Sequence, residues 1–419
     1  MTDTLSAPPT GYARVFAVRE FRAVFAAHLL ALLGVVVAEI SLSVLVYDLT
    51  GSPLLSALAF ALGFLPYVVG GTLLAGAADR FPARRVLVLC DLVCAACVLP
   101  MTLPGAQIGV LLALRCALAV VSPVFAGTRM ATLADILGDG DLFVLGRSLL
   151  RIVSQGALLA GYGVGGVLLT VVSPRHALLI TVVTFCASAG LLRFGTRRRP
   201  ARAASGGNAL VTDSLKGARQ VLADSRTRVL LFLFWVPPMF AVVPEALAAP
   251  YADELGVGSV GLGLLMCALP VGTIAGELWA GARLRPAARE RIALPLVCVT
   301  LLPYVGYALR PGPAVSLLLL FLSGAGSAYT LGLDQWFVRA VPEGLRGRAM
   351  TLLTAGLMTI QGVGMALAGV VAEFAGVAWT VAGAGVVGAV GCALLAAEAR
   401  RTAGEGAGRP NAKTGLTTM

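Results

Sequence analysis

Long uncharged runs separated by short polar intervals dominate the chain. Leu54 to Ala78 contains no charged residue, and Val86 to Leu114 contains only Asp91. The apolar residues fill these runs continuously, whereas the strands of a membrane barrel would alternate, so the runs indicate helices. A helix of about 20 residues crosses the hydrocarbon core of a bilayer. The pattern therefore predicts a polytopic helical membrane protein.

Twelve such spans are predicted, in two groups of six. The first group covers 24–47, 54–78, a third span that ends near 104, 108–133, a fifth that ends near 172 and a sixth that ends near 194. The second group covers 229–250, 260–282, 292–309, 314–338, 347–371 and 377–396. The predicted fold is thus all-α, with 12 transmembrane helices in two pseudo-symmetric six-helix halves.

The polar intervals set the expected domain boundaries. We expect a cytoplasmic segment at 1–20, a six-helix half at 21–194, a cytoplasmic linker at 195–228, a second half at 229–397 and a disordered cytoplasmic tail at 398–419. In the linker, Val211, Leu215, Ala218 and Leu222 repeat on one face of a short amphipathic helix.

Basic residues gather in alternate loops, which predicts the orientation. The loops placed outside contain only Arg175 and Arg310, and the remaining loops hold most of the arginines. Positive charge is retained on the cytoplasmic side of membrane proteins. We therefore expect a multi-pass protein of a bacterial cytoplasmic membrane, with both termini in the cytoplasm.

Composition supports this class. Of 419 residues, 58% are apolar and 13% are charged, whereas soluble domains average about 45–50% and about 25%. The net charge of +11 could suggest nucleic-acid binding. Because the basic residues gather on one membrane face, no nucleic-acid partner is expected.

No motif of a soluble enzyme is present in the sequence. There is no HExxH, P-loop or GxSxG pattern, and the eight cysteines all lie inside apolar runs. We therefore expect no enzymatic activity, no cofactor and no metal site. Without an ATPase motif, uphill transport would have to use an ion gradient or a partner protein.

The two halves resemble one another around a buried acid. Glu39 precedes Tyr47 by eight residues at the end of the first span, and Glu245 precedes Tyr251 by six at the end of the seventh. Parallel six-helix repeats with a binding site at their midplane interface are a recurrent plan of secondary transporters.

Three stretches carry a resemblance to a known family. The loop Asp79-Arg80-Phe81-Pro82-Ala83-Arg84-Arg85 is similar to the G-x-x-x-D-R-x-G-R-R/K signature of the major facilitator superfamily. The stretch Gly161-Tyr162-Gly163-Val164-Gly165-Gly166 resembles its antiporter motif G-P-x-x-G-G, with Tyr162 in place of proline. The opening Phe21-Arg22 through Asp48-Leu49-Thr50-Gly51-Ser52-Pro53, with Arg346-Gly347-Arg348, resembles the drug-exporter branch that includes macrolide and enterobactin exporters.

The resemblance implies roles for several residues. In the signature loop it implies an intracellular gate latch, with plain positive-inside anchors as the alternative; the residues are Gly76, Asp79, Arg80, Arg84 and Arg85. The corresponding loop of the second half, Arg283-Leu284-Arg285-Pro286, has no acid, so latching is expected to be asymmetric. The antiporter-like motif contributes Gly161, Gly163, Gly165 and Gly166.

Charged and polar residues inside the spans are the remaining candidates. A buried carboxylate is costly unless it is protonated, paired or facing water, so Glu39 and Glu245 are candidates for proton coupling, with a structural pair as the alternative. Candidates for the substrate cavity are Arg115, Gln155, Tyr162 and Gln361. Candidates for the inner gate are Asp334, Arg339, Arg346 and Arg348, whereas His28 is interpreted as interfacial.

The sequence therefore predicts a secondary active transporter that works by alternating access. The expected mode is proton-coupled efflux of a moderately hydrophobic small molecule, as in antiporters of multidrug resistance. The alternatives are an importer or facilitator of the same fold, or a membrane enzyme or sensor. The expected partners are a small-molecule substrate, protons and the lipid bilayer, and the expected oligomeric state is a monomer.

Overall fold

The structure is a computed structural model that describes residues 12–67, 81–138, 141–199, 219, 222–341 and 346–407. Within these ranges all regular secondary structure is helical. The first half contains α1 (Tyr12–Ala17), α2 (Arg19–Thr50), α3 (Pro53–Phe64), α6 (Ala83–Met101), α7 (Ile108–Leu137), α8 (Asp141–Val171) and α9 (Pro174–Gly195).

The second half contains more helical pieces because several of its spans are broken. They are α11 (Ser225–Ala241), α12 (Val243–Ala246), α13 (Ala248–Glu254), α14 (Gly258–Arg283), α15 (Pro286–Val299), η2 (Leu302–Leu309), α16 (Pro313–Gly326), η3 (Ser327–Tyr329), α17 (Thr330–Ala340), α18 (Arg346–Ala375) and α19 (Val377–Ala407). The prediction of an all-α membrane fold is confirmed.

Nine segments of the described chain are long and apolar enough to cross a membrane. The other three predicted spans correspond to α3, α6 and α8. The apolar parts of α3 and α8 are shorter there, at Pro53–Phe64 and Gly156–Val171, while α6 carries Arg84, Arg85 and Asp91 within 19 residues.

The turn between α2 and α3 follows directly from its sequence. Gly51 adopts a left-handed conformation (φ 64°), and its N–H donates to the Tyr47 carbonyl at 2.7 Å. Ser52 then caps α3 by accepting a hydrogen bond from the Leu55 N–H at 3.3 Å, and Pro53 fits the first helical position. The predicted turn is therefore present.

The seventh span is not the continuous helix expected at 229–250. Pro237 and Pro238 lie inside α11, which ends at Ala241, and Pro244 is the second residue of the four-residue α12. Proline lacks a backbone N–H and clashes with the preceding turn, so it breaks or kinks helices. This break places Glu245 in a short helical turn instead of on a regular helix.

Other boundaries also differ from the prediction. The ninth and tenth spans each contain a 3₁₀ segment, η2 and η3, and α19 extends to Ala407, into the predicted tail. In the linker only residues 195–199, Arg219 and residues from Leu222 onward belong to the described ranges. Most of the predicted amphipathic helix therefore lies outside the described residues.

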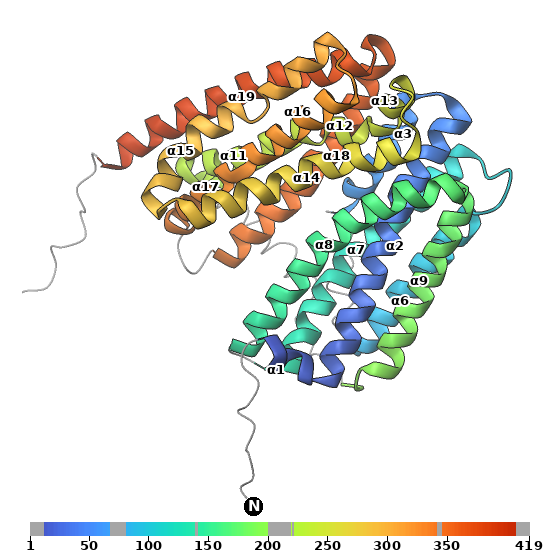
Figure 1. The fold of residues 1–419 in the computed structure, drawn as a ribbon. Helices are drawn as coiled ribbons and strands as arrows, with labels where there is room; N and C mark the ends of the chain where they lie inside the picture. The colour runs from blue at the N-terminus through green and yellow to red at the C-terminus, as the bar shows by residue number, and fades with distance from the viewer. Residues whose placement is uncertain are drawn as a thin grey trace, which may run out of the picture.

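The two halves form a V in Figure 1, with the green and blue helices of the first half below and the yellow to red helices of the second half above. They meet where α3 packs on α18 and α8 packs on α14. At the second crossing a side chain on Gly166 would collide with the Ser259 carbonyl (2.7 Å) and with the Gly263 Cα (2.8 Å). The backbones of the two halves can approach this closely because both positions are glycine.

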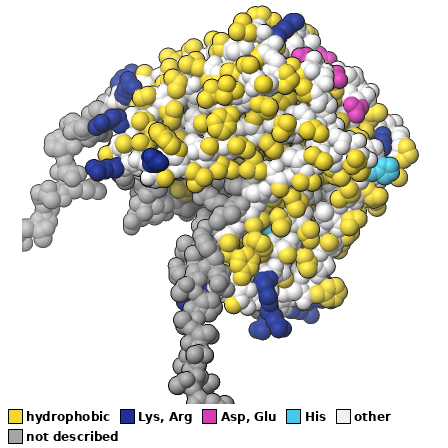
Figure 2. Space-filling view, in the orientation of Figure 1, with side chains coloured by type: hydrophobic (Ala, Val, Ile, Leu, Met, Phe, Trp, Pro, Cys, Tyr) yellow, Lys and Arg dark blue, Asp and Glu magenta, His cyan; other side chains and the backbone are white. Residues whose placement is uncertain are grey.

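The surface is apolar over most of its area, and the charges lie at its ends (Figure 2). Apolar side chains such as Leu278, Leu394 and Val183 are more than 60% exposed on the sides of the helices. In Figure 2 the acidic residues gather near the apex of the V, while most of the visible arginines lie toward its far ends. This arrangement fits a molecule surrounded by lipid with water at both ends.

Helix crossings inside the second half depend on glycine, and this can be tested in α14. A Cβ at Gly272 would lie 2.8 Å from the carbonyl carbon of Phe321 in α16, whereas a Cβ at Gly281 meets nothing within 4 Å. We expect Gly272→Val to destabilise the protein by about 1–3 kcal/mol through overpacking. Thermal unfolding in detergent micelles measures this, with Gly281→Val as the control on the same helix. Equal midpoints for the two variants would contradict this packing.

Candidate functional site

A buried ion pair lies inside the first half. Arg115 of α7 donates through Nη2 to the Glu39 carboxylate of α2 and through Nε to the Ala59 carbonyl of α3 at 3.3 Å. The side chains of Arg115 and Glu39 are 8% and 14% exposed. Gly63 makes room for the guanidinium, because a Cβ there would lie 2.7 Å from Arg115 Cζ. The pair joins three helices at one point.

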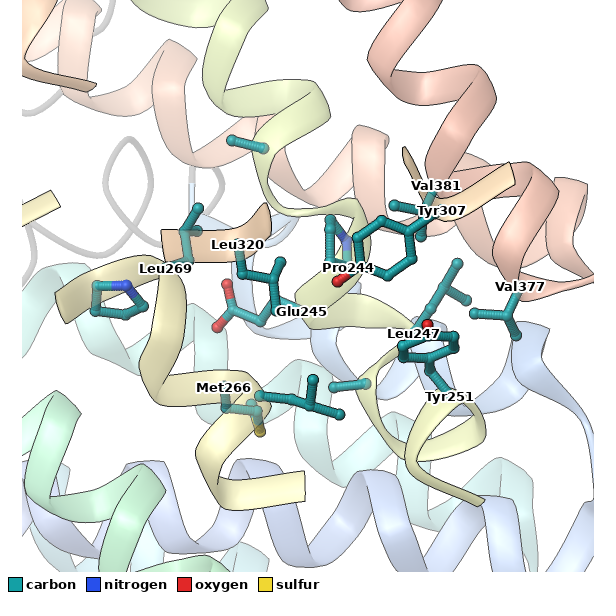
Figure 3. A pocket seen from close by; sticks show the side chains of 14 residues that line it. Pro244, Glu245, Leu247, Tyr251, Met266, Leu269, Tyr307, Leu320, Val377 and Val381 are labelled. Atoms are coloured by element: carbon teal, nitrogen blue, oxygen red, sulfur yellow. The ribbon is translucent and has the colours of Figure 1, made fainter. Parts of the chain in front are cut away.

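A second buried carboxylate lies in the other half. Glu245 of α12 sits between Leu269, Leu320 and Met266, as Figure 3 shows, beside a cavity of about 20 Å³ that can hold one water molecule. Its carboxylate accepts a hydrogen bond from the Tyr162 hydroxyl of α8. Tyr162 is 3% exposed, so this contact is a buried bond between the two halves.

These two sites form one polar cluster, defined by Glu39, Arg115, Tyr162 and Glu245. The Glu39 carboxylate is near enough to interact electrostatically with Tyr162 and with Glu245. The structure therefore brings together both proton-coupling candidates and two of the four substrate-cavity candidates. Because only one of the four groups is a fixed cation, the cluster holds two acids against one positive charge.

The antiporter-like motif positions this cluster. A Cβ on Gly161 would lie 2.6 Å from Val36 Cγ1 of α2, and one on Gly165 would lie 3.0 Å from Ile40 Cδ1. Gly163 faces the other half, where Cys267 Sγ would lie 3.9 Å from its Cβ. Small residues thus let α8 approach α2 on one side and α14 on the other, with Tyr162 between them.

A second set of contacts closes the apex of the V. Glu373, at the end of α18, accepts hydrogen bonds from the Ser52 hydroxyl (3.0 Å) and from the Leu54 N–H (3.3 Å) at the start of α3. A carboxylate at a helix N-terminus is favoured by the helix dipole. Nearby, the Tyr47 hydroxyl donates to Asp253 across the halves at 3.4 Å. We call Ser52, Leu54, Glu373, Tyr47 and Asp253 the apex latch.

Acidic groups cluster next to the apex latch. Burial raises the pKa of the Glu254 carboxyl; Arg310 opposes this rise, and the neighbouring Asp253 adds to it. Asp253 also interacts electrostatically with Asp48 of α2. Excess negative charge therefore lies at the end of the molecule where the two halves are in contact.

A cavity of about 720 Å³ lies within the first half. Its walls come from α2, α6, α7, α8 and α9, and they are mainly apolar, with Leu32, Val121 and Phe125 among them. The polar lining residues are His28, Tyr67, Asp91, Ser122, Arg129 and Ser154. A volume of this size holds a drug-sized ligand.

The residues that line this cavity differ from the predicted ones. Arg115 and Tyr162 are buried outside its lining, and Gln361 is half-buried and is not among the lining residues either. The cavity instead contains His28, which is 5% exposed. His28 contacts Arg129 and hydrogen-bonds to the Ser154 hydroxyl at 3.1 Å. The interpretation of His28 as interfacial is therefore wrong.

The ends opposite the apex are held by intra-half contacts. Arg84 Nη1 donates to the Thr196 carbonyl at 3.1 Å, which ties α6 to the end of α9. Arg199 pairs with Glu20 at the start of α2, and this hydrogen-bonded partner raises the pKa of the Arg199 guanidinium. In the second half Arg339 pairs with Glu290 at 2.7 Å. In the described chain these pairs lie within one half each.

Several predicted residues cannot be placed. Gly76, Asp79 and Arg80 lie outside the described residues, as do the side chains of Gln155, Arg346 and Arg348. Arg85 and Asp334 are exposed. The gate role of the signature loop therefore stays a prediction.

Sequence reasoning missed Arg129, Glu373 and the role of Asp91. A charge inside a predicted span was the available signal for Arg129 and Asp91. Glu373 lies at the end of a span, where nothing in the sequence indicates its partner on α3. Among the described residues, no group of three or more His, Cys, Asp or Glu side chains could hold a metal ion.

The apolar helical fold, the two halves and the buried acids define a membrane transporter. The family model of the Major Facilitator Superfamily matches residues 24–335. The chain belongs to the Major Facilitator Superfamily. No match was found among curated protein sequences.

Solved structures agree with this fold. The chain is similar to a bacterial homologue of the human lysosomal transporter Spinster, inward-facing and unoccupied, with 15% identity, a TM-score of 0.66 and coverage of 92% of this chain and 97% of that one. It is also similar to a mutant of the nucleoside transporter NupG, with 14% identity, a TM-score of 0.65 and coverage of 92% of this chain and 99% of that one. The partially occluded inward-open xylose transporter XylE from E. coli is similar with 13% identity, a TM-score of 0.62 and coverage of 90% of this chain and 97% of that one. At these identities the likeness shows the fold.

Removing one partner of the buried Arg115–Glu39 pair should be costly. Breaking a buried pair costs about 3–5 kcal/mol because a charge is left without its counter-ion. We expect Glu39→Gln to lower the free energy of unfolding in mixed micelles by this amount. Arg115→Gln should cost less at acid pH, because the carboxylate can take up a proton whereas a guanidinium cannot lose one.

The matched control is the pair of Arg401 and Glu398, whose side chains are 74% and 42% exposed. Glu398→Gln should change stability by less than about 0.5 kcal/mol. If Glu39→Gln is as mild as Glu398→Gln, the pair at Glu39 is not buried as described.

Proposed function

We propose that this transporter is a secondary active exporter that couples proton entry to efflux of a moderately hydrophobic small molecule. Its two halves alternate between packings that expose the substrate site to one side of the membrane and then to the other. The observation that carries this proposal is the polar cluster of Glu39, Arg115, Tyr162 and Glu245 at the contact between the halves.

The cluster has the composition that proton coupling needs. A buried acid changes its charge when it binds a proton, and a guanidinium does not. Protonation of Glu39 would release Arg115 from its counter-ion, and ionisation of Glu245 would alter its bond with Tyr162. Each event changes a contact between helices, and the second contact joins the two halves. A proton can therefore favour one packing over the other.

The distribution of charge supports an orientation. Most of the visible arginines lie toward the spread ends of the V, and the visible acids lie toward its apex (Figure 2). By the positive-inside rule the spread ends face the cytoplasm of a bacterial cell, with both termini inside. In this orientation the described packing is open inward and closed outward, and the apex latch is the outer gate. The resemblance to drug exporters supports efflux, and we propose that the transporter acts as a monomer.

An importer or facilitator of the same fold is the alternative. The same cluster would serve a symporter, because binding and release of a proton are reversible. Accumulation of cargo in right-side-out vesicles, abolished by an uncoupler, would favour import. Accumulation in inverted vesicles would favour export.

Proton coupling can be tested in proteoliposomes that contain a pH-sensitive dye. With an imposed pH gradient, a panel of apolar small molecules should include at least one that drives proton flux through the wild-type protein. We expect Glu39→Gln and Glu245→Gln each to reduce this flux to the level of empty liposomes, since neither side chain can then carry a proton. Glu398→Gln, at a carboxylate whose side chain is 42% exposed, is the matched control. Undiminished coupled flux in both cluster variants would refute the assignment.

The apex latch can be tested by cysteine accessibility. Charge-assisted hydrogen bonds contribute about 1.5–3 kcal/mol, so Glu373→Ala should raise the outward-open population by about tenfold or more. Ala57, which is fully buried beside Gly369 of α18, provides the reporter position. In a background without native cysteines, Ala57→Cys should react with an impermeant maleimide about tenfold faster when Glu373→Ala is added. An unchanged rate, as expected for Glu398→Ala, would show that Glu373 does not hold the apex closed.

A further inference from the structure

The 720 Å³ cavity contains a cation, Arg129, that forms no ion pair with a carboxylate of the described residues. Arg129 contacts the His28 imidazole, and its guanidinium carbon lies 4.3 Å from the centre of the Phe125 ring. Its Nε is buried with no hydrogen-bond partner. In the described part of the chain no carboxylate forms an ion pair with Arg129. By contrast, Arg115, which lies on the same helix α7, forms an ion pair with Glu39.

Asp91 lines the same cavity and interacts electrostatically with Arg129, but it forms no ion pair or hydrogen bond with it among the described contacts. Its Oδ2 accepts a hydrogen bond from the Ser188 hydroxyl at 2.6 Å, and the residue is 2% exposed. The Ser188 Oγ also lies 3.1 Å from the Ala27 carbonyl oxygen. Asp91 is therefore enclosed among α2, α6 and α9, and Arg129 is the more accessible of the two charges.

An arginine in this setting favours an anion. A guanidinium stays protonated, so it cannot avoid the cost of burial by losing its charge. The His28 imidazole that accepts a hydrogen bond from Arg129 is neutral, and the face of the Phe125 ring offsets only part of the cost of burying the positive charge. A carboxylate, sulfonate or phosphate fits the fork of N–H donors and would place a negative charge in direct contact with the Arg129 guanidinium.

We propose that this cavity binds an amphipathic organic oxyanion, with its acidic group on Arg129 and its apolar body along Phe125, Val121 and Leu32. The Ser154 hydroxyl, 3.1 Å from His28 Nε2, lines the same cavity, but its proton is donated to the Leu150 carbonyl at 2.9 Å, so Arg129 is the main donor for the anion. This inference rests on the proposed function, because it names the class of cargo that the exporter takes. It adds a charge to a cargo so far described only as moderately hydrophobic.

The test compares ligands that differ only in charge. Purified protein in a neutral detergent is titrated by calorimetry with 1-naphthoate, 1-naphthalenesulfonate and 1-naphthyl phosphate. The neutral control is 1-naphthamide, and the cationic control is 1-naphthylmethylammonium. We expect at least one oxyanion to bind about tenfold or more tightly than the amide and the ammonium. Equal binding of anion and amide, or no binding of any of the three anions, would overturn the proposal.

Variants then locate the site. Arg129→Gln should weaken anion binding by about tenfold or more, and Arg129→Lys should retain most of it because the charge remains. Asp91→Asn should leave the anion affinity unchanged or higher. If the wild-type protein binds the ammonium and Asp91→Asn abolishes this binding, the cavity is a cation site and the proposal is overturned. If Arg129→Gln fails to fold, the comparison of ligands on the wild-type protein still decides.

Two further arms separate other outcomes. A lipid headgroup presents the same oxyanion as a free acid, so the titration is repeated in nanodiscs with and without phosphatidylglycerol. Competition by the lipid would assign the site to a lipid phosphate, and an unchanged affinity would assign it to a soluble acid. Binding in detergent needs no gradient, so Glu39→Gln should bind the anion even where proton-coupled transport fails. Anion binding without coupled flux in the wild type would refute only the proposed function.

Discussion

Two carboxylates buried in an apolar contact between helices are the constraint on which the structure depends. Lipid and packed apolar side chains offer no solvation for a charge, so each acid needs a partner or a proton. Glu39 has Arg115, and Glu245 has the Tyr162 hydroxyl. The partners come from α7 and α8, so these helices must approach α2 and α12 closely. The glycines of α8 and Gly63 of α3 make that approach possible.

The same arrangement divides the interface into parts with different roles. Near the apex, glycine-mediated crossings and the apex latch hold the halves together through backbone contact and three hydrogen bonds. Further in, the polar contacts between the halves include the Tyr162 hydroxyl on the Glu245 carboxylate and the Cys267 thiol, which lies 3.5 Å from the Leu159 carbonyl. A change in protonation therefore acts where the halves meet, and the apex latch is the set of contacts that must separate in the other packing. Hydrogen bonds of this kind are individually modest, so the two packings can differ by only a few kcal/mol.

Hydrophobic pattern alone predicted the helices, the two halves and the class of protein. It succeeded because lipid imposes the same length and polarity on every span. It missed the break at Pro244, although the prolines were visible, because a broken span has the same mean hydropathy as a continuous one.

The sequence predicted which residues belong to the polar cluster, but not which of them contact one another. Glu39, Glu245, Arg115 and Tyr162 were recognisable as polar groups in apolar runs. That Arg115 belongs to Glu39, and that Tyr162 crosses to the other half, depends on helix packing between residues far apart in the chain. The replacement of the motif proline by Tyr162 looked like a lost feature, whereas in the fold it supplies the hydroxyl that binds Glu245. The cavity with Arg129 could not be outlined at all, since its walls come from five helices.

The central claim is that protonation of the buried acids sets which packing the halves adopt. The most direct test places spin labels in a cysteine-free background, one pair near the apex at Val171 and Leu309 and one pair at the opposite end at Phe194 and Arg283. Val171, Leu309 and Phe194 are at least 80% exposed. Pulsed electron paramagnetic resonance then measures both distances as the pH is varied. We expect the two distances to change in opposite directions with pH in the wild type, and to be independent of pH in the Glu39→Gln, Glu245→Gln double variant. Distances that do not change with pH in the wild type, or that change with pH in the double variant as they do in the wild type, would contradict the account.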